Sequence, residues 1–396
     1  MIVCWILGMG SAVSWNTMLI IGDYYYKLFP RYHPERVLTV ICQTFAIGSM
    51  AILTYKEAIT NTPKRNIIGY TLFCVSTLIL IVLDLATSGQ GGIGPYIGIC
   101  VIVVAFGVAT ALVQGGGTGD LSFMSPEFVR SFIAGLAASG VLTSALRLMT
   151  KAVFGKSDDG ERNGAMLFLG IPAFVGLLCT FLCAFIFPKL STVKYYRMKA
   201  ASEGSQTVSA DLAVVGIQTE QSQAGDDTQE RLSNKQLFFQ NIDYALEAFL
   251  GHLVTLSIFP GFLFENTGKH QLGSWYPLVL ITVFNVWDMI SRYFPVVKCL
   301  RLPRRGLMVG ILIQFLFIPV FYFTAKYGDQ GWMILLTSFL GIFNGYLTVC
   351  VFTNAPKGYK GPEQNALGNM LTLCLHCGIF AGVACDWLWL IGKESF

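Results

Sequence analysis

The chain has 396 residues, of which 54% are hydrophobic and 13% are charged, and its mean hydropathy is +0.59. Soluble domains carry roughly a quarter of charged residues, so this composition indicates a membrane protein. The net charge of +4 is small and the basic residues fall in short segments between apolar runs, which argues against nucleic acid as a partner.

Eleven apolar segments are long enough to cross a bilayer as helices, at about 20 residues per crossing. The first begins almost at Met1 and lacks the basic leader and small-residue cleavage site of a signal peptide, so we expect a retained helix. An odd number of crossings puts the two ends of the chain on opposite faces. The predicted spans are residues 2–26, 37–57, 66–87, 95–118, 128–153, 164–187, 239–264, 274–297, 306–325, 331–354 and 366–391.

The orientation follows from the basic residues in the loops. One face carries nearly twice as many Lys and Arg residues as the other, and the richer face is expected to be cytoplasmic. This places the N-terminus and the connection between the sixth and seventh spans in the cytoplasm, and the C-terminus outside.

That connection, residues 188–238, is the one long polar stretch of the chain. From Ala200 to Gln236 it is rich in Ser, Gln, Gly, Asp and Glu, so it cannot bury enough apolar surface to fold alone. We predict a flexible cytoplasmic loop between a six-helix half, residues 1–187, and a five-helix half, residues 239–396. Its serines and threonines are either phosphorylation sites or part of a solvated linker.

Polar and aromatic residues interrupt the first span at its centre. Trp15 and Asn16 lie in mid-membrane, where anchoring at the lipid headgroups explains a tryptophan poorly. The indole can pack or stack there, and the Asn16 amide needs a partner.

The fourth span contains the run Gln114-Gly-Gly-Gly-Thr-Gly-Asp120. It lacks the Gly-Lys-Ser/Thr ending of a phosphate-binding loop and follows no strand, which excludes nucleotide hydrolysis as a power source. Such glycines are tolerated where an irregular helix lies beside a cavity. Gln114 is then either a solute ligand or the partner of an interhelical hydrogen bond, and Asp120 lies near the predicted cytoplasmic mouth.

Asp288 and Arg292 form an opposite-charge pair inside the eighth span. At positions i and i+4 they share a helix face, so they can neutralise each other while pointing away from lipid. A lone charge at mid-bilayer costs roughly 3 to 17 kcal/mol, so such residues usually line a protein interior or a solute path. The alternative is that the pair only locks the two halves together. Arg147, in the fifth span, is expected to extend toward the interface.

The sequence contains no motif that indicates an enzyme. His252 and His376 are isolated, and the sequence has no metalloprotease or nucleophile motif. Cys374 and Cys377 form a C-x-x-C on a predicted membrane helix without a second ligand cluster, so packing explains them better than a metal. We expect no catalytic residue, no metal and no cofactor.

Several of these features together resemble the equilibrative nucleoside transporter family. They are Trp15-Asn16 in the first span, Gln114-Gly115 in the fourth, and Phe284-Asn285-x-x-Asp288-x-x-x-Arg292 in the eighth. Asn344-Gly345-Tyr346 and Pro356-Lys357 are also similar to the family. Asp23-Tyr-Tyr and Gly119-Asp-Leu-Ser look closest to its plant members.

The resemblance implies an all-α fold related to the major facilitator architecture, with two pseudo-symmetric bundles and a site between them near the midplane. It implies transport of purine and pyrimidine nucleosides, with Trp15 and Gln114 at the base and Asp288 and Arg292 near the ribose. Asn16, Leu19 and Asn285 would complete the lining. Two departures from the family pattern, Val129-Arg-Ser-Phe-Ile-Ala-Gly135 and Gln314, bear on base selectivity and gating.

The mode of transport and the membrane remain expectations of the resemblance. Plant-like members include proton-coupled carriers, so a proton gradient is a candidate energy source, with Asp120 and Asp23 as candidate coupling groups. We expect a monomer in the plasma membrane, with the vacuolar membrane as the alternative. Two further alternatives are a receptor that binds nucleosides without moving them and a carrier of nucleobases or other small organic solutes.

Overall fold

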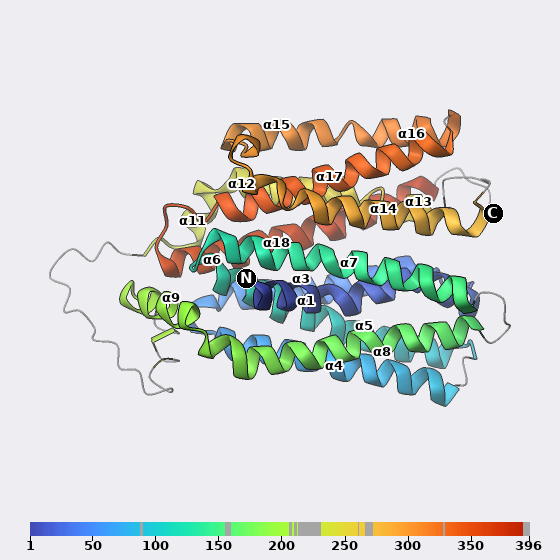
Figure 1. Cartoon of the computed structure of the whole chain (residues 1–396), viewed down its shortest axis with the longest axis horizontal. Helices are drawn as coiled ribbons and strands as arrows, with labels where there is room; N and C mark the ends of the chain where they lie inside the picture. The colour runs from blue at the N-terminus through green and yellow to red at the C-terminus, as the bar shows by residue number, and fades with distance from the viewer. Residues whose placement is uncertain are drawn as a thin grey trace.

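The computed structural model describes residues 1–87, 90–154, 160–205, 208–209, 212, 231–259, 261–265, 272–327 and 329–390. Every regular element in these ranges is a helix. Ten helices among them are long and apolar enough to cross a membrane. The long helices run side by side along the length of the molecule (Figure 1).

The predicted eighth span is the one that falls short of this length. Its main helix, α14 (Tyr276–Ser291), has 16 residues and is flanked by the 3₁₀ turns η5 (Gly273–Trp275) and η6 (Phe294–Val296). Pro295 lacks a backbone N–H and lies in η6, which limits how far the helix continues. Because α14 still runs alongside the longer helices, eleven crossings remain an approximate count (Figure 1).

The first half of the chain forms one bundle. Its helices are α1 (Ile2–Ile20), α2 (Gly22–Leu28), α3 (Pro34–Tyr55), α4 (Thr62–Thr87), α5 (Ile93–Thr110), α6 (Gly116–Ser122), α7 (Pro126–Phe154) and α8 (Gly160–Phe181). Within it, α1 packs against α7 and α8, and α4 packs against α5 and α8.

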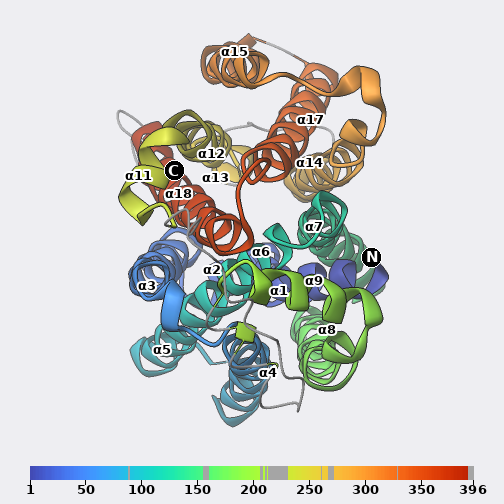
Figure 2. The same ribbon diagram turned by 90° about the vertical axis from the view of Figure 1, so that its left-hand side faces the viewer.

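The second half forms the other bundle. Its helices are α12 (Ile242–Leu256), α13 (Gly261–Glu265), α14, α15 (Arg304–Gln314), α16 (Phe317–Tyr327), α17 (Gln330–Asn354) and α18 (Gly361–Asp386). The bundles meet where α7 packs against α14 and α17, and where α18 packs against α3 and α6 (Figure 2).

Two helices in the connection between the halves lie at one end of the molecule. They are α9 (Ser191–Ser202) and α11 (Asn234–Gln240), and α11 begins with a capping box in which Ser233 and Gln236 satisfy each other's backbone N–H groups. Both lie at the same end of the bundles in Figure 1. Most of the predicted flexible loop between them lies outside the described residues.

Two of the long helices are interrupted at defined points. The fourth span changes from α5 to the π-helix η2 (Ala111–Gly115) before continuing as α6, so the irregular geometry falls at the start of the glycine-rich run. The ninth span breaks between α15 and α16, and Pro319 in the first turn of α16 explains the break because it cannot donate to the carbonyl of Phe315.

The outer faces of the bundles are apolar. Large hydrophobic side chains are exposed along α4, α8 and α16, as expected for surfaces that meet lipid hydrocarbon. Examples are Ile79 and Val82 on α4, Phe174 and Leu177 on α8, and Phe323 on α16. Polar and charged side chains of the long helices instead concentrate inside, where the candidate site lies.

Candidate functional site

Asp288 is buried and its carboxylate is bonded on both oxygens. Arg292 Nη2 donates to Oδ2 at 2.9 Å, which makes the pair predicted from the i, i+4 spacing. Asn344 Nδ2, from α17, donates to Oδ1 at 2.7 Å. The side chains of Asp288 and Arg292 are 6% and 9% exposed, so the pair faces the protein interior and not lipid.

Two further side chains extend this network within the second bundle. Thr255 on α12 donates to Asn344 Oδ1 at 3.0 Å. Gln314, the last residue of α15, donates to Thr255 Oγ1 at 2.8 Å and to the Gly251 carbonyl at 3.2 Å. The carboxylate of Asp288 is therefore connected to three other helices, and a displacement of its Asn344 partner would reach α12 and α15.

The α7–α14 joint is the contact made by Asn285 and Arg292 with the first bundle. Arg292 Nη1 donates to the Ile133 carbonyl on α7. Asn285 Nδ2 donates to Ser144 Oγ at 2.7 Å and to the Gly140 carbonyl at 3.2 Å. A side-chain carbon on Gly140 would lie 2.6 Å from Asn285 Oδ1, so glycine permits this close approach.

Asn16, on α1 of the first bundle, also bonds to α7. Its Nδ2 donates to Ser139 Oγ on α7 at 2.6 Å, which gives the mid-membrane amide its partner. Of the predicted substrate residues, Asn16, Asn285 and Arg292 thus all bond to α7. That helix is the common support of the predicted site.

Gln114 lies on η2 and links α1 with α18. Its Nε2 donates to the Ser11 carbonyl at 3.3 Å, and its Oε1 lies 3.2 Å from His376 Nε2. His376 Nδ1 in turn lies 3.0 Å from Gln43 Oε1 on α3. In this conformation Gln114 therefore makes the interhelical hydrogen bonds that were one of its two predicted roles. Through His376, which looks isolated in the sequence, Gln114 connects the two bundles.

Trp15 and Leu19 are half-buried and lie apart from these contacts. They line a small pocket formed by α1, α2 and α3, which includes Tyr25 and Thr39 but neither Gln114 nor Asp288. The structure does not bring all the predicted substrate residues around one cavity in this conformation.

The α4–α18 joint is a second polar contact between the bundles, and the sequence did not single it out. Its members are Arg65 on α4, Glu57 on the preceding turn η1 (Glu57–Ile59), Asn365 and Asn369 on α18, and Arg231 in the connection between the halves. Arg65 donates to Asn369 Oδ1 at 2.9 Å, Asn365 Nδ2 donates to Glu57 Oε1 at 2.9 Å, and Arg231 donates to Glu57 Oε2 at 2.7 Å. In the sequence, Asn365 and Asn369 lie four residues apart and so share one face of the last predicted span. That pattern is the feature from which a polar contact could have been predicted.

Arg65 also stabilises the irregular turn η2. Its Nη2 and Nε donate to the carbonyls of Ala111 and Leu112 at 2.8 and 3.0 Å. Carbonyls in a π-helix lack the usual i+4 partner, so a guanidinium with several fixed donors suits this position. The α4–α18 joint therefore touches the helix segment that carries Gln114.

The candidate coupling residues have different surroundings. Asp120, on α6, forms a buried ion pair with Arg197 of α9 at 3.0 Å. Asp23 lies on α2, and its side chain is outside the described part of the structure. Arg147 was expected to reach the interface, but it is 4% exposed and lies within the protein.

A pair of helical bundles that meet through buried polar joints is the architecture of a membrane transporter. The fold matches the proton:xylose symporter XylE bound to 6-bromo-6-deoxy-D-glucose, with a TM-score of 0.68 over 98% of this chain and 88% of that chain at 12% identity. It also matches the human organic anion transporter MFSD10, with a TM-score of 0.56 over 98% of this chain and 93% of that chain at 13% identity. The predicted major-facilitator-like fold is confirmed.

The chain belongs to the nucleoside transporter family, whose sequence model matches residues 99–391. It is 64% identical to equilibrative nucleotide transporter 3 of Arabidopsis thaliana, over 100% of this chain and 95% of the relative. It is 60% identical to equilibrative nucleotide transporter 6 of the same plant, over 100% of this chain and 95% of the relative. It is 28% identical to equilibrative nucleotide transporter 1, over 98% of this chain and 86% of that relative. The resemblance and the assignment as a transporter and not an enzyme are confirmed.

Proposed function

We propose that this chain carries nucleosides, purine and pyrimidine alike, across a membrane by alternating access of the two bundles. The observation that carries the proposal is the Asp288–Arg292 pair at the α7–α14 joint. The pair belongs to the second bundle, and Arg292 reaches a backbone carbonyl of the first. A bound solute that takes over one of these bonds changes how tightly the bundles hold together.

The chemistry of the joint suits a ribose. Asp288 Oδ1 and Oδ2 accept hydrogen bonds from Asn344 and Arg292 in this conformation, and ribose hydroxyls are donors that can replace them. Arg292 donates to an oxygen, and a ribose hydroxyl or base carbonyl offers one. If ribose hydroxyls replace Asn344 or Arg292 as the partners of Asp288, the carboxylate keeps its hydrogen bonds throughout. Reversible binding in a low-dielectric interior requires this, because a buried charge without a hydrogen bond is costly.

The base would lie against Gln114 and Trp15 once the bundles separate around the solute. Gln114 has a donor and an acceptor on one amide, which matches the edges of purines and pyrimidines without selecting one. Leu19, Asn16 and Asn285 would line the remaining wall. Symport with a proton, location in the plasma membrane or the vacuolar membrane, cytoplasmic placement of the N-terminus and action as a monomer are parts of this proposal.

The proposal is tested by counterflow of labelled uridine and adenosine in liposomes that contain the purified protein. Asp288→Asn and Arg292→Ala are each expected to reduce exchange by about 100-fold or more, since removing one member of a buried pair costs roughly 3–5 kcal/mol. Glu127→Gln, an exposed change at the start of α7, serves as the control and keeps the wild-type rate.

Size-exclusion elution establishes whether each variant remains folded. Wild-type exchange in both variants would remove Asp288 and Arg292 from the site. Saturable nucleoside binding by the wild-type protein without any counterflow would favour the receptor, and exchange of free nucleobases but not nucleosides would favour the nucleobase carrier.

A further inference from the structure

Glu247 is a buried carboxylate that has no hydrogen-bond partner among the residues that the structure describes. It lies in the second turn of α12, about 8 Å along the axis from the start of the helix, and its side chain is 1% exposed. Within the described residues, neither Oε1 nor Oε2 accepts a hydrogen bond. Asp120, Asp243 and Asp288 each have an arginine partner, so Glu247 differs from them in kind.

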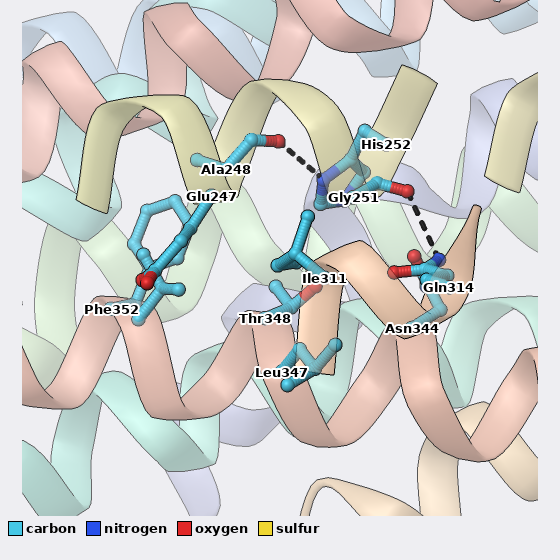
Figure 3. A pocket seen from close by; sticks show the side chains of 11 residues that line it. Glu247, Ala248, Gly251, His252, Ile311, Gln314, Asn344, Leu347, Thr348 and Phe352 are labelled. Carbon is cyan, nitrogen blue, oxygen red and sulfur yellow. Dashed lines mark hydrogen bonds between the residues drawn. The ribbon is translucent and has the colours of Figure 1, made fainter. Parts of the chain in front are cut away.

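The carboxyl group of Glu247 points into a pocket between α12, α15 and α17. Figure 3 shows the side chain extending from α12 beside Phe352 of α17. The pocket volume is about 10 Å³, which is roughly the space that one water molecule needs. A second buried acceptor in the same pocket, Gln314 Oε1, also has no donor among the described residues.

The pocket shares residues with the network around Asp288. Asn344 lines it and donates to Asp288 Oδ1, and Gln314 lines it and donates to Thr255. A change in the packing of α12 against α15 and α17 therefore acts on the Asn344 bond to Asp288. The pocket and the proposed nucleoside site are two parts of one hydrogen-bonded system.

No described positive charge is available to neutralise Glu247. Arg304 of α15, at the same end, is already bonded to Asp243 and to the Gln240 carbonyl, and its guanidinium stacks on Tyr244. His252 Nδ1 lies 2.9 Å from the Ala248 carbonyl. The other cations on elements packed against α12, Lys235 of α11 and Arg305 of α15, are exposed. The remaining titratable groups on these elements are Cys350 and Tyr346 of α17 and Glu363, Cys374, His376, Cys377, Cys385 and Asp386 of α18.

An ionised carboxylate in such a place costs several kcal/mol, whereas the protonated acid costs little. We propose that Glu247 is the proton-binding group of this carrier. Its carboxyl group holds a proton while α12, α15 and α17 are packed together, and it releases the proton when a rearrangement within the second bundle loosens this packing and admits water. The inference rests on the proposed function and names the group through which a proton gradient would drive it.

The step is a simple proton transfer. On opening, the O–H bond of the Glu247 carboxyl breaks, the electron pair stays on the carboxylate oxygen and the proton passes to water. The pocket cannot close around the ionised group, so the cycle continues only after a proton returns. Because Asn344 is shared, closure of the pocket and reformation of the Asn344–Asp288 bond accompany each other.

The test compares exchange with gradient-driven accumulation in liposomes at zero membrane potential. The wild-type protein is expected to exchange uridine without a gradient and to accumulate it up to about ten-fold with a gradient of one pH unit. Glu247→Gln imitates the protonated acid. It is expected to keep exchange within about two-fold of the wild type and to lose accumulation entirely.

Asp120→Asn is the matched comparison, because Asp120 is also buried but paired with Arg197. Loss of this pair is expected to lower the yield of folded protein and the rate of exchange, but the folded protein should reach the wild-type accumulation ratio. Wild-type accumulation by Glu247→Gln, or loss of accumulation by Asp120→Asn alone, would overturn the assignment. Exchange by the wild type that ignores the gradient would overturn it while leaving nucleoside transport intact, and absence of exchange would remove both.

Infrared spectroscopy of the wild-type protein adds a readout that does not depend on transport. The carbonyl stretch of a protonated carboxylic acid is expected at neutral pH and should be missing in Glu247→Gln. If the Glu247→Gln variant fails to fold, the Glu247→Asp variant is used in its place, and this substitution should shift the frequency of the carbonyl band. A wild-type spectrum without the band would contradict the proposal.

Discussion

The two joints between the bundles are built from different chemistry. At the α7–α14 joint the charges stay together on one helix, and the contacts across the joint go to carbonyl and hydroxyl groups of α7. At the α4–α18 joint the charged Arg65 and Glu57 belong to the first bundle, and each bonds to a neutral amide of α18. In both joints a carboxylate accepts from one asparagine and one arginine. We expect the α7–α14 joint, which holds the proposed ribose ligands, to exchange partners with a solute, and the α4–α18 joint, which holds none of them, to act as a closure.

The difference predicts that variants at the α7–α14 joint change affinity and variants at the α4–α18 joint change the rate of the conformational cycle. The loss of about 100-fold or more expected for Asp288→Asn and Arg292→Ala is the largest effect. Three smaller effects separate the joints further.

The largest of these is expected at Gly119, where α6 meets α18. A side-chain carbon there would lie 2.2 Å from Asn365 Oδ1 and 2.3 Å from Asn369 Nδ2. Because overpacking costs roughly 1–3 kcal/mol, Gly119→Ala should reduce uridine uptake by about ten-fold or more. Gly170→Ala on α8, where a side-chain carbon meets nothing within 4 Å, is the control and should have no effect on initial uptake rates.

A paired comparison of two asparagines follows. Asn285→Ala removes two hydrogen bonds at the α7–α14 joint that share one Nδ2 group, each worth roughly 0.5–0.7 kcal/mol, so the KM for uridine should rise by about five- to ten-fold. Asn369→Ala removes the partner of Arg65 and should change the maximal rate several-fold while KM stays within about two-fold. Saturation curves for both variants check this, and the reverse pattern would exchange the roles of the two joints.

The smallest effect concerns pH. Burial raises the pKa of Glu57 above its usual value, although Arg231, Arg65 and Asn365 act in the opposite direction. The closed joint therefore binds a proton more tightly than the opened joint, so closure is favoured as pH falls and weakened as pH rises through the raised pKa. Labelling of Asn365→Cys by a thiol reagent should slow modestly at acid pH, and Glu57→Gln should abolish that dependence.

Much of the fold was predictable because span length and hydropathy are properties of consecutive residues. All eleven predicted segments contain helices among the described residues, and the one segment that does not count among the ten long apolar helices, 274–297, has its main helix α14 end before Pro295. The glycine-rich run also predicted an irregular helix, which η2 confirms. The domain boundaries at 187 and 239 remain predictions, since most of the connection between α9 and α11 lies outside the described residues.

The partners within the site were not predictable from spacing. Asp288 and Arg292 were paired correctly because they lie four residues apart, but Asn344 comes from another helix. Gln314 was noted only as a departure from the family, and Asn365 and Glu57 are 308 positions apart. Arg147 was misjudged because distance from a span end does not say whether the neighbouring surface is lipid or protein.

The end of the connection between the halves is fastened to both of them. Arg231 bonds to Glu57 of the first bundle at 2.7 Å, and the next residue, Leu232, donates its backbone N–H to Glu363 of α18 at 3.0 Å. Separation of the bundles at this end requires either that Arg231 leave Glu57 or that Leu232 leave Glu363. We therefore expect the connection to contribute to the activation barrier for opening, so that its sequence sets part of the turnover rate without touching the solute.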